Sequence, residues 1–190
     1  MIEAGAALAD EVGPAPLSMG LLAARLGVKT PSLYRHVDSL ADLHHRIAVL
    51  AMNELADAIR DAIAGRAGKD ALAAGAQAMR AFARRHAGRY ELGNAALLTG
   101  PDDPLLPASR RVMDTWAAML YGYHLDPADE IHAMRMLRSM LHGFVVLETT
   151  GSFQVDASTD DSYTWIIEFI DHGLRATSTR PTPILTATSH

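Results

Sequence analysis

The stretch LAARLGVKTPSLYRHV, residues 22–37, is the most informative part of this sequence. Ala23 lies four residues before Gly27, so a small side chain lets two helices approach and the glycine makes the tight bend between them. Thr30 is a suitable N-cap, and Pro31 suits the first helical position because its missing N–H costs nothing there. The stretch therefore predicts a helix-turn-helix, whose second helix lies in the major groove of DNA.

The second helix of this pair would turn hydrogen-bonding side chains outward. Leu33 and Val37 are expected in the core, which leaves Thr30, Ser32, Tyr34, Arg35 and His36 to face DNA. The segment also carries Arg25, Lys29 and Arg35 and no acid, a local charge of +3 in a chain whose net charge is −5. Such a basic patch is what a nucleic-acid function requires of an acidic protein. An ordinary helical hairpin turned at a glycine is the alternative.

The composition indicates a globular chain. Its 190 residues are 49% hydrophobic and 21% charged, enough to bury a core as one domain or as one domain with a small appendage. The absence of cysteine excludes disulfides, thiolate metal sites and thiol catalysis. No apolar run approaches the roughly 18 residues that cross a bilayer, and the first residues do not read as a secretory signal. We expect a cytoplasmic protein without membrane contacts.

Helical spacing of the apolar residues, with breaks at glycine and proline, predicts an all-α fold. The expected helices are 2–12, a second one after Ser18, a third of about two turns from Thr30, 39–64, one from about Leu72 that stops near Gly88, one after Pro104 that contains 112–120, 126–150 and 160–176. A helix-turn-helix head is expected over 1–46, an effector-binding and dimerisation domain over 47–176, and a flexible tail over 177–190. The long helix would join the first two.

The segment GVKTPSLYRHV resembles the recognition helix of the TetR family of bacterial transcriptional repressors, including its Leu-Tyr-x-His core. The resemblance implies that Tyr34 and His36 bind backbone phosphates and that Pro31 and Ser32 touch base edges. The complete expected DNA-binding set is Ser18, Lys29, Thr30, Pro31, Ser32, Tyr34, Arg35 and His36. The resemblance further implies a homodimer that binds a palindromic site on double-stranded DNA. A small apolar or amphipathic effector would release this dimer from the DNA.

The sequence departs from the family pattern in the same region. Leu40 stands where the family usually has a lysine that grips a phosphate, and Gly20 replaces a side chain that often reaches DNA. Asp38 adds an acid beside the groove, and the chain opens inside the expected first helix without the basic arm of many relatives. These departures favour weak or strongly salt-dependent DNA binding.

The carboxy-terminal part carries a second resemblance. Residues 141–144, Leu-His-Gly-Phe, together with 147–148, 151–153 and 162–163, look like the effector domain of a TetR subfamily named for a Trp-His-Gly motif, with leucine in place of tryptophan. In TetR-type proteins the last two long helices pair with their copies in a second subunit as a four-helix bundle. The expected interface residues are His142, Gly143, Phe144, Trp165 and Phe169.

Methionine and aromatic residues mark a candidate effector cavity, because methionine adapts to irregular apolar shapes. The expected lining is Met79, Phe82, Met113, Trp116, Met119, Met136 and Met140, with plain core packing as the alternative. The histidines are dispersed and no E-x-x-H pair exists, so neither a metal nor a cofactor is expected. The basic run Arg80, Arg84, Arg85 and Arg89 suggests a solvated helix face.

Two other classes of function remain open. One is a binding or adaptor protein whose helix-turn-helix has degenerated, which the departures at Gly20 and Leu40 favour. The other is a helical enzyme that uses the cavity. The sequence contains no G-x-S-x-G, P-loop or G-x-G-x-x-G motif, and we assign no catalytic residue.

Overall fold

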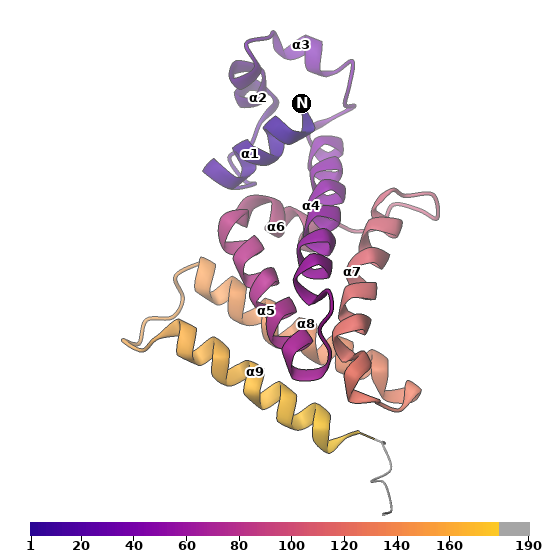
Figure 1. The fold of residues 1–190 in the computed structure, drawn as a ribbon. Helices are drawn as coiled ribbons and strands as arrows, with labels where there is room; N and C mark the ends of the chain where they lie inside the picture. The colour runs from indigo at the N-terminus through magenta and orange to yellow at the C-terminus, as the bar shows by residue number, and fades with distance from the viewer. Residues whose placement is uncertain (179–190) are drawn as a thin grey trace, which may run out of the picture.

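The computed structural model describes residues 1–178, and over this range it consists of helices without strands (Figure 1). The helices are α1 (Ile2–Val12), α2 (Met19–Leu26), α3 (Thr30–Leu33), α4 (Leu40–Ile63), α5 (Gly68–Arg85), α6 (Ala87–Ala95), α7 (Leu105–Leu120), the 3-10 helix η1 (Tyr121–Tyr123), α8 (Pro127–Thr149) and α9 (Thr159–Ala176). The predicted all-α fold is confirmed. The expected tail, 177–190, lies almost entirely outside the described residues.

Local capping signals start several of these helices where the sequence predicts. The side chains of Ser18, Ser39 and Asp126 each accept a hydrogen bond from a backbone N–H of the first turn, at 3.2, 3.0 and 2.9 Å respectively. Each bond satisfies a donor that would otherwise lack an intrahelical partner. Pro127 then occupies the start of α8, as expected of a residue without an N–H.

The hydrophobic core divides into two clusters along α4. Helices α1, α2 and α3 pack on the first turns of α4, and this head cluster extends to Ile47. The second cluster starts at Ala48 and is built from α4, α5, α7, α8 and α9 with parts of α6 and η1. One continuous helix therefore runs from the head into the body, which Figure 1 shows for α4.

The sequence did not predict α6 as a separate helix. The helix expected to stop near Gly88 ends at Arg85, because His86 leaves the helical conformation with φ −129° and ψ 51°. Gly88 lies inside α6 against α1, where an added Cβ would come within 2.0 Å of the Ala9 carbonyl oxygen. The glycine thus allows a close approach of two helices and does not mark a helix end.

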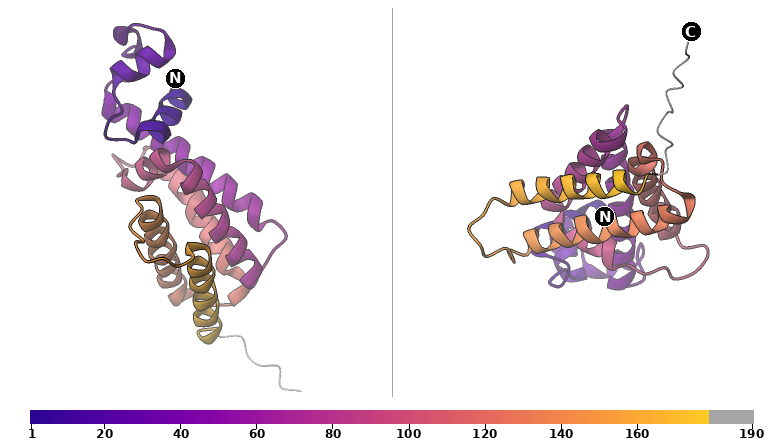
Figure 2. Two further views of the ribbon diagram at one scale, coloured as in Figure 1. Left: turned by 90° about the vertical axis from the view of Figure 1, so that its left-hand side faces the viewer. Right: turned by 90° about the horizontal axis from the view of Figure 1, so that it is seen from below.

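Helices α8 and α9 run antiparallel, side by side, on the body (Figure 2). Helix α8 packs on α5 and α7, and α9 packs on α5. The head stands at the opposite end of the elongated molecule. Among the described residues, no helix combines the length and the apolar character needed to span a membrane.

Candidate functional site

The turn between α2 and α3 has the geometry that the sequence predicts. Gly27 adopts φ 67° and ψ 28°, the left-handed region that side chains with a Cβ avoid. The Val28 N–H donates to the Ala23 carbonyl at 3.0 Å and closes the end of α2. The chain can therefore enter α3 within two residues of the turn.

Helix α3 is shorter than expected and starts differently. Its N-cap is Lys29, with no side-chain hydrogen bond, and Thr30 is already helical. The helical turn continues past Leu33, because the Val37 N–H donates to the Leu33 carbonyl at 3.2 Å. Leu33 and Val37 are both buried, as predicted, and they fix which side of the segment faces away from the head.

The predicted DNA-binding residues other than Ser18 lie within α3 or directly beside its two ends, and α3 lies at the tip of the head (Figure 1). Lys29, Pro31, Tyr34, Arg35 and His36 are exposed, Thr30 and Ser32 are half-buried, and Tyr34 keeps 51% of its surface accessible. Ser18 lies at the start of α2, where its hydroxyl caps the helix. This segment therefore exposes a phenol, an imidazole and two cations, with two half-buried hydroxyls beside them.

The positive charge of this surface is smaller than the sequence suggests. Arg25 hydrogen-bonds through both terminal nitrogens to the Glu11 carboxylate of α1, with one contact at 2.9 Å. Arg46 binds Asp42 one turn away at 2.9 Å. One of the three positive charges of residues 22–37, that of Arg25, is thus neutralised within the head. Lys29 and Arg35 are the cations of the head that form no ion pair within residues 1–178.

The three departures from the family pattern lie around this surface. Leu40 is half-buried and packs against the head cluster, so it offers nothing to a phosphate. Gly20 is exposed in the first turn of α2, where an added Cβ would meet only the Ser18 hydroxyl at 3.9 Å. Asp38 is exposed as well. At these three positions the head therefore offers no cation to a phosphate.

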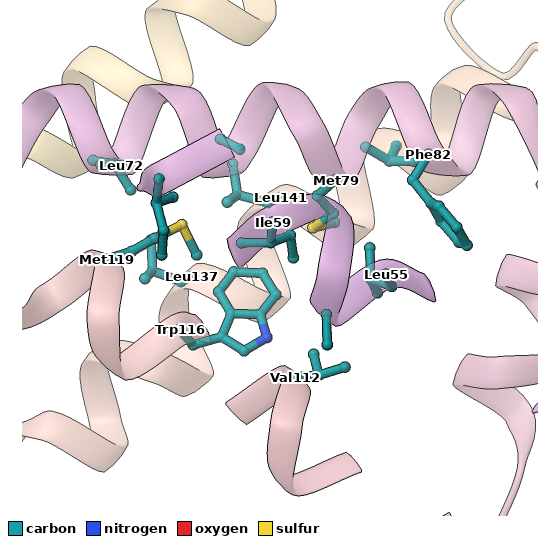
Figure 3. Close-up of a cluster of buried hydrophobic side chains, with 14 of the residues drawn as sticks. Leu55, Ile59, Leu72, Met79, Phe82, Val112, Trp116, Met119, Leu137 and Leu141 are labelled. Carbon is teal, nitrogen blue, oxygen red and sulfur yellow. The ribbon is translucent and has the colours of Figure 1, made fainter. Parts of the chain in front are cut away.

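The body contains a cleft of about 340 Å³ between α4, α6, α7 and α8, with a contribution from α5. Its apolar wall includes Met52 and Leu55 of α4, Met79 of α5, and Val112 and Trp116 of α7. Figure 3 shows the last four of these side chains converging on the same part of the core. The space is of the size of a small-ligand site, for which volumes of roughly 300–1,000 Å³ are usual.

A polar side completes the cleft. The Tyr90 hydroxyl and His142 Nδ1 share a hydrogen bond of 2.9 Å, and Asn94, Arg135 and Arg138 line the same space. Burial raises the pKa of Tyr90 above its ordinary value. Burial, helped by the nearby Arg138, lowers the pKa of His142, which keeps the imidazole neutral at pH 7.

The structure brings together only some of the residues expected around an effector. Met79, Met113 and Trp116 line the cleft, whereas Phe82, Met119, Met136 and Met140 do not. Met119 fills the space beside Gly75, where an added Cβ would lie 2.1 Å from its sulfur. Sequence reasoning missed the polar lining. The sequence pattern that could have revealed part of this lining is a spacing of three or four residues, which places several side chains on one face of α8. These residues are Ile131, Met134, Arg135, Arg138 and His142.

The residues expected at the dimer interface also separate into two groups. His142 faces the cleft, and Phe144 is buried inside the protomer, with its ring 5.0 Å from that of Tyr163. Phe144 therefore lies inside the protomer, and His142 is half-buried at the cleft. Trp165 and Phe169 are 65% and 55% exposed and stack on each other at 5.5 Å. Gly143 is half-buried, and an added Cβ there would meet nothing within 4 Å.

The basic run on α5 and α6 is not a solvated face throughout. Arg84 and Arg85 are exposed, but Arg80 is only 4% exposed and binds Glu148 and Asp160, the latter at 2.8 Å. The bond from Arg80 lowers the pKa of Glu148 below its usual range. The prediction was wrong for Arg80, and equally for Arg89, because their partners come from distant helices.

Arg89 joins three helices. It is 8% exposed, and its guanidinium reaches Asp10 of α1 and Glu54 of α4, each at 2.8 Å. Its backbone N–H also donates to the Asp10 carboxylate at 2.9 Å. The next residue, Tyr90, reaches into the cleft. Helix α6 therefore contacts the head on one side and the cleft on the other.

Comparisons with known proteins agree with this architecture. Residues 1–47 match the family described as bacterial regulatory proteins, tetR family, and residues 72–170 match the tetracyclin repressor-like C-terminal domain. The narrower likeness to the Trp-His-Gly subfamily stays a prediction.

Two relatives of similar length are described as HTH-type transcriptional regulators. An uncharacterized HTH-type transcriptional regulator of Mycobacterium tuberculosis is 34% identical over 179 residues, which covers 94% of this chain and 82% of the relative. An uncharacterized HTH-type transcriptional regulator of Bacillus subtilis is 32% identical over 176 residues, which covers 92% of this chain and 90% of the relative.

Solved structures share the fold. A possible TetR family transcriptional regulator from Streptomyces coelicolor A3(2) superposes with a TM-score of 0.70 at 19% identity, over 92% of this chain and 97% of its own. A TetR variant from Acinetobacter baumannii AYE in complex with minocycline gives a TM-score of 0.69 at 19% identity, over 94% and 96% of the two chains. Together with the family matches and the close relatives, the helix-turn-helix head and the helical body show that this chain is a transcriptional regulator of the TetR family.

Proposed function

We propose that the protein is a ligand-responsive repressor that binds a palindromic DNA operator as a homodimer. The observation that carries the proposal is the head surface, where Tyr34, His36 and the unpaired Lys29 and Arg35 are exposed directly beside the two ends of α3. Hydrogen-bonding side chains and cations in the first turns of a recognition helix suit the phosphates and base edges of a major groove. A small apolar or amphipathic effector in the body cleft would release the DNA.

The small number of unpaired cations on the head predicts how strongly DNA binding depends on salt. Each head offers the cations Lys29 and Arg35, so a dimer would neutralise about four phosphates through them. The logarithm of the affinity should then fall with the logarithm of the salt concentration with a slope of about −4, since each neutralised phosphate contributes about −0.9. Tight operator binding consequently depends on uncharged contacts such as those of Tyr34 and Ser32.

The first prediction separates docking from sequence recognition. Tyr34→Ala and His36→Ala should weaken binding to operator and to random duplex alike, by about 1–3 kcal/mol in free energy, because a phosphate contact carries no sequence information. Ser32→Ala should change the preference among sequences. The measurement is fluorescence anisotropy at low salt, with a labelled fragment from beside the protein's own gene and a random duplex of equal length.

Tyr121 provides a matched control, because it is an exposed tyrosine on η1, in the body. Tyr121→Ala should leave DNA binding unchanged. An unchanged affinity in the Tyr34 variant, or an equal loss in the Tyr121 variant, would remove the proposed docking of the head. A wild-type chain that fails to bind any fragment at low salt would favour the adaptor alternative.

The second prediction concerns the dimer. Trp165 and Phe169 expose a stacked aromatic pair on the outer face of α9, and Gly143 leaves open space on the neighbouring α8. Large aromatic side chains exposed together on one helix are typical of an interface with a second subunit. Gly143→Leu should therefore yield monomers in light scattering, because the side chain has room within the protomer and would keep only a second copy away.

Gly100→Leu is the control for this substitution, since an added Cβ at Gly100 also meets nothing within 4 Å and the residue lies in the α6–α7 loop. It should leave the oligomeric state unchanged. A wild-type chain that is monomeric at micromolar concentration, or a dimeric Gly143→Leu variant, would contradict the assignment of this face.

A further inference from the structure

We propose that the body cleft selects a small amphipathic organic anion, whose acid group is held by Arg135 and Arg138 while its apolar body lies against Trp116 and Met79. The inference rests on the proposed function in that it takes this cleft as the effector site. It goes further by assigning the charge and the chemical class of the ligand.

The side chains that line the cleft carry a net positive charge. The residues around the cleft include no aspartate or glutamate, yet they include Arg135 and Arg138. Neither arginine forms an ion pair with any other residue in the described range. The two buried arginines of the body, Arg80 and Arg89, are by contrast paired with carboxylates. The cleft therefore has two cations without a counter-ion from the protein.

The spacing of the two arginines makes an anion the natural partner. Positions three apart on a helix lie on the same face, and like charges placed so repel each other by a few tenths of a kcal/mol. An acid group between them removes the repulsion and accepts hydrogen bonds from both. Guanidinium groups bind such oxyanions through paired N–H donors, and these charge-assisted bonds are shorter and stronger than neutral ones.

The other polar groups of the cleft keep the local charge positive. His142 is neutral because burial, with the nearby Arg138, lowers its pKa. It shares a hydrogen bond with Tyr90, whose pKa is raised by burial, so the phenol carries no negative charge either. Asn94 adds a neutral amide. The polar side thus combines two positive charges with neutral hydrogen-bonding groups, and nothing in it favours a cationic ligand.

The opposite wall defines the rest of the ligand. Met52, Leu55, Met79, Val112 and Trp116 form an apolar surface in a cleft of about 340 Å³. An aromatic or branched aliphatic body fits there, since methionine side chains adapt to irregular shapes and the indole offers a flat face. Arg135 and Arg138 are exposed, at the open side of the cleft, so the acid group would stay near water while the body is buried.

The test compares two dyes that differ mainly in charge. Anilinonaphthalene sulfonate is an aromatic anion, and N-phenylnaphthylamine has the same aromatic body without the sulfonate. Titrated into the full chain and followed by fluorescence, the sulfonate should bind at least about tenfold more tightly than the neutral dye. Trp116 is part of the apolar wall, so Trp116→Leu should weaken the binding of both dyes if they occupy the cleft. Leu97→Ala, at an exposed leucine that does not line the cleft, should weaken neither.

Variants assign the preference to the two arginines. The double variant Arg135→Met and Arg138→Met should lose about tenfold or more in affinity for the sulfonate and keep its affinity for the neutral dye. Arg66→Met is the matched control, because Arg66 is an exposed arginine between α4 and α5 without an ion pair in the described range and away from the cleft. It should change neither affinity.

Three results would overturn the proposal: equal affinities of the two dyes for the wild-type chain, an unchanged affinity of the double variant for the sulfonate, or dye binding that Trp116→Leu leaves unchanged. All are read without DNA. A failure of the charge preference is therefore distinguishable from a failure of the proposed repressor function, which is decided by the anisotropy measurement on the operator.

Discussion

Arg89 holds the head to the body through charges that are largely removed from water. Its guanidinium meets Asp10 of α1 and Glu54 of α4, and burial would by itself lower its pKa. The two carboxylates outweigh that effect and raise the pKa, so the residue stays charged. Removing one member of such a network leaves the remaining charges buried without a partner. The stability lost in this way is larger than the stability that the intact pair contributes.

Arg89→Met should therefore lower the free energy of unfolding by about 3 kcal/mol, as is typical when a buried ion pair is broken from one side. Urea denaturation followed by circular dichroism measures the change. Arg85→Met is the control, because Arg85 is exposed on the adjacent helix and has no ion pair in the described range. Its effect should stay within about 0.5 kcal/mol. Equal effects of the two substitutions would mean that the Arg89 network stabilises nothing.

The same residues show where inference from the sequence stops. The basic run on α5 and α6 suggested a solvated face, but Glu148 lies 68 residues from Arg80, and Asp10 and Glu54 lie 79 and 35 residues from Arg89 along the chain. Helical spacing reports which residues share a face of one helix, and it does not report which acids another helix brings to that face. By contrast, Leu33 and Val37 were assigned to the core correctly, because their neighbours are local.

At the scale of helices, the docking of α6 on α1 depends on Gly88. The ideal Cβ position at this residue lies 2.0 Å from the Ala9 carbonyl oxygen and 2.8 Å from the Asp10 backbone nitrogen. These atoms belong to the backbone of α1 and cannot rotate away as a side chain would. The two helices therefore approach as closely as a glycine permits, and this contact connects the head to a helix that lines the cleft.

Gly88→Ala should force α1 and α6 apart and lower the free energy of unfolding by about 1–3 kcal/mol, the usual cost of an overpacked contact. Gly20→Ala is the opposite case, because an added Cβ there meets only the Ser18 hydroxyl at 3.9 Å. It should stabilise α2 by about 0.5–1 kcal/mol through helix propensity. Thermal and urea unfolding measure both. A Gly88→Ala variant as stable as the wild type would show that α1 and α6 are not held in this close contact.

The elements that the sequence predicted best are those with local start signals. The caps at Ser18, Ser39 and Asp126 set α2, α4 and α8 at the expected positions, because a cap involves residues within one turn. The break before α6 carries no such signal, since His86 leaves the helix without a glycine or proline. The lining of the cleft was predicted only in part, because the orientation of each methionine depends on how the helices are rotated against one another.

At the scale of the whole molecule, two helices connect the cleft with the head. Helix α4 contributes Met52 and Leu55 to the cleft and Ile47 to the head cluster. Helix α6 contributes Tyr90 and Gly93 to the cleft and packs its first turn on α1. A ligand that displaces either helix therefore moves the head relative to α8 and α9, the helices through which we propose that the dimer forms.

Such a displacement matters because of the symmetry of the proposed complex. Two recognition helices read one palindrome only if their separation matches a helical turn of DNA or a multiple of it, about 34–36 Å per turn. The outer end of α4 carries the head, so a small tilt at the cleft becomes a larger shift at α3 (Figure 1). A ligand in the cleft and an operator on the heads should then favour different arrangements of the same dimer.

The final prediction follows from this coupling and is reciprocal by thermodynamic necessity. If anilinonaphthalene sulfonate in the cleft weakens operator binding by some factor, saturating operator must weaken binding of the dye by the same factor, typically about 5–150-fold in regulatory proteins. Dye titrations with and without operator, and operator titrations with and without dye, measure the two factors independently. The double variant Arg135→Met and Arg138→Met should lose the effect at dye concentrations that saturate the wild type, because it no longer holds the anion. Equal dye affinities in the free protein and in the operator complex would mean that the cleft is not connected to the head, whatever it binds.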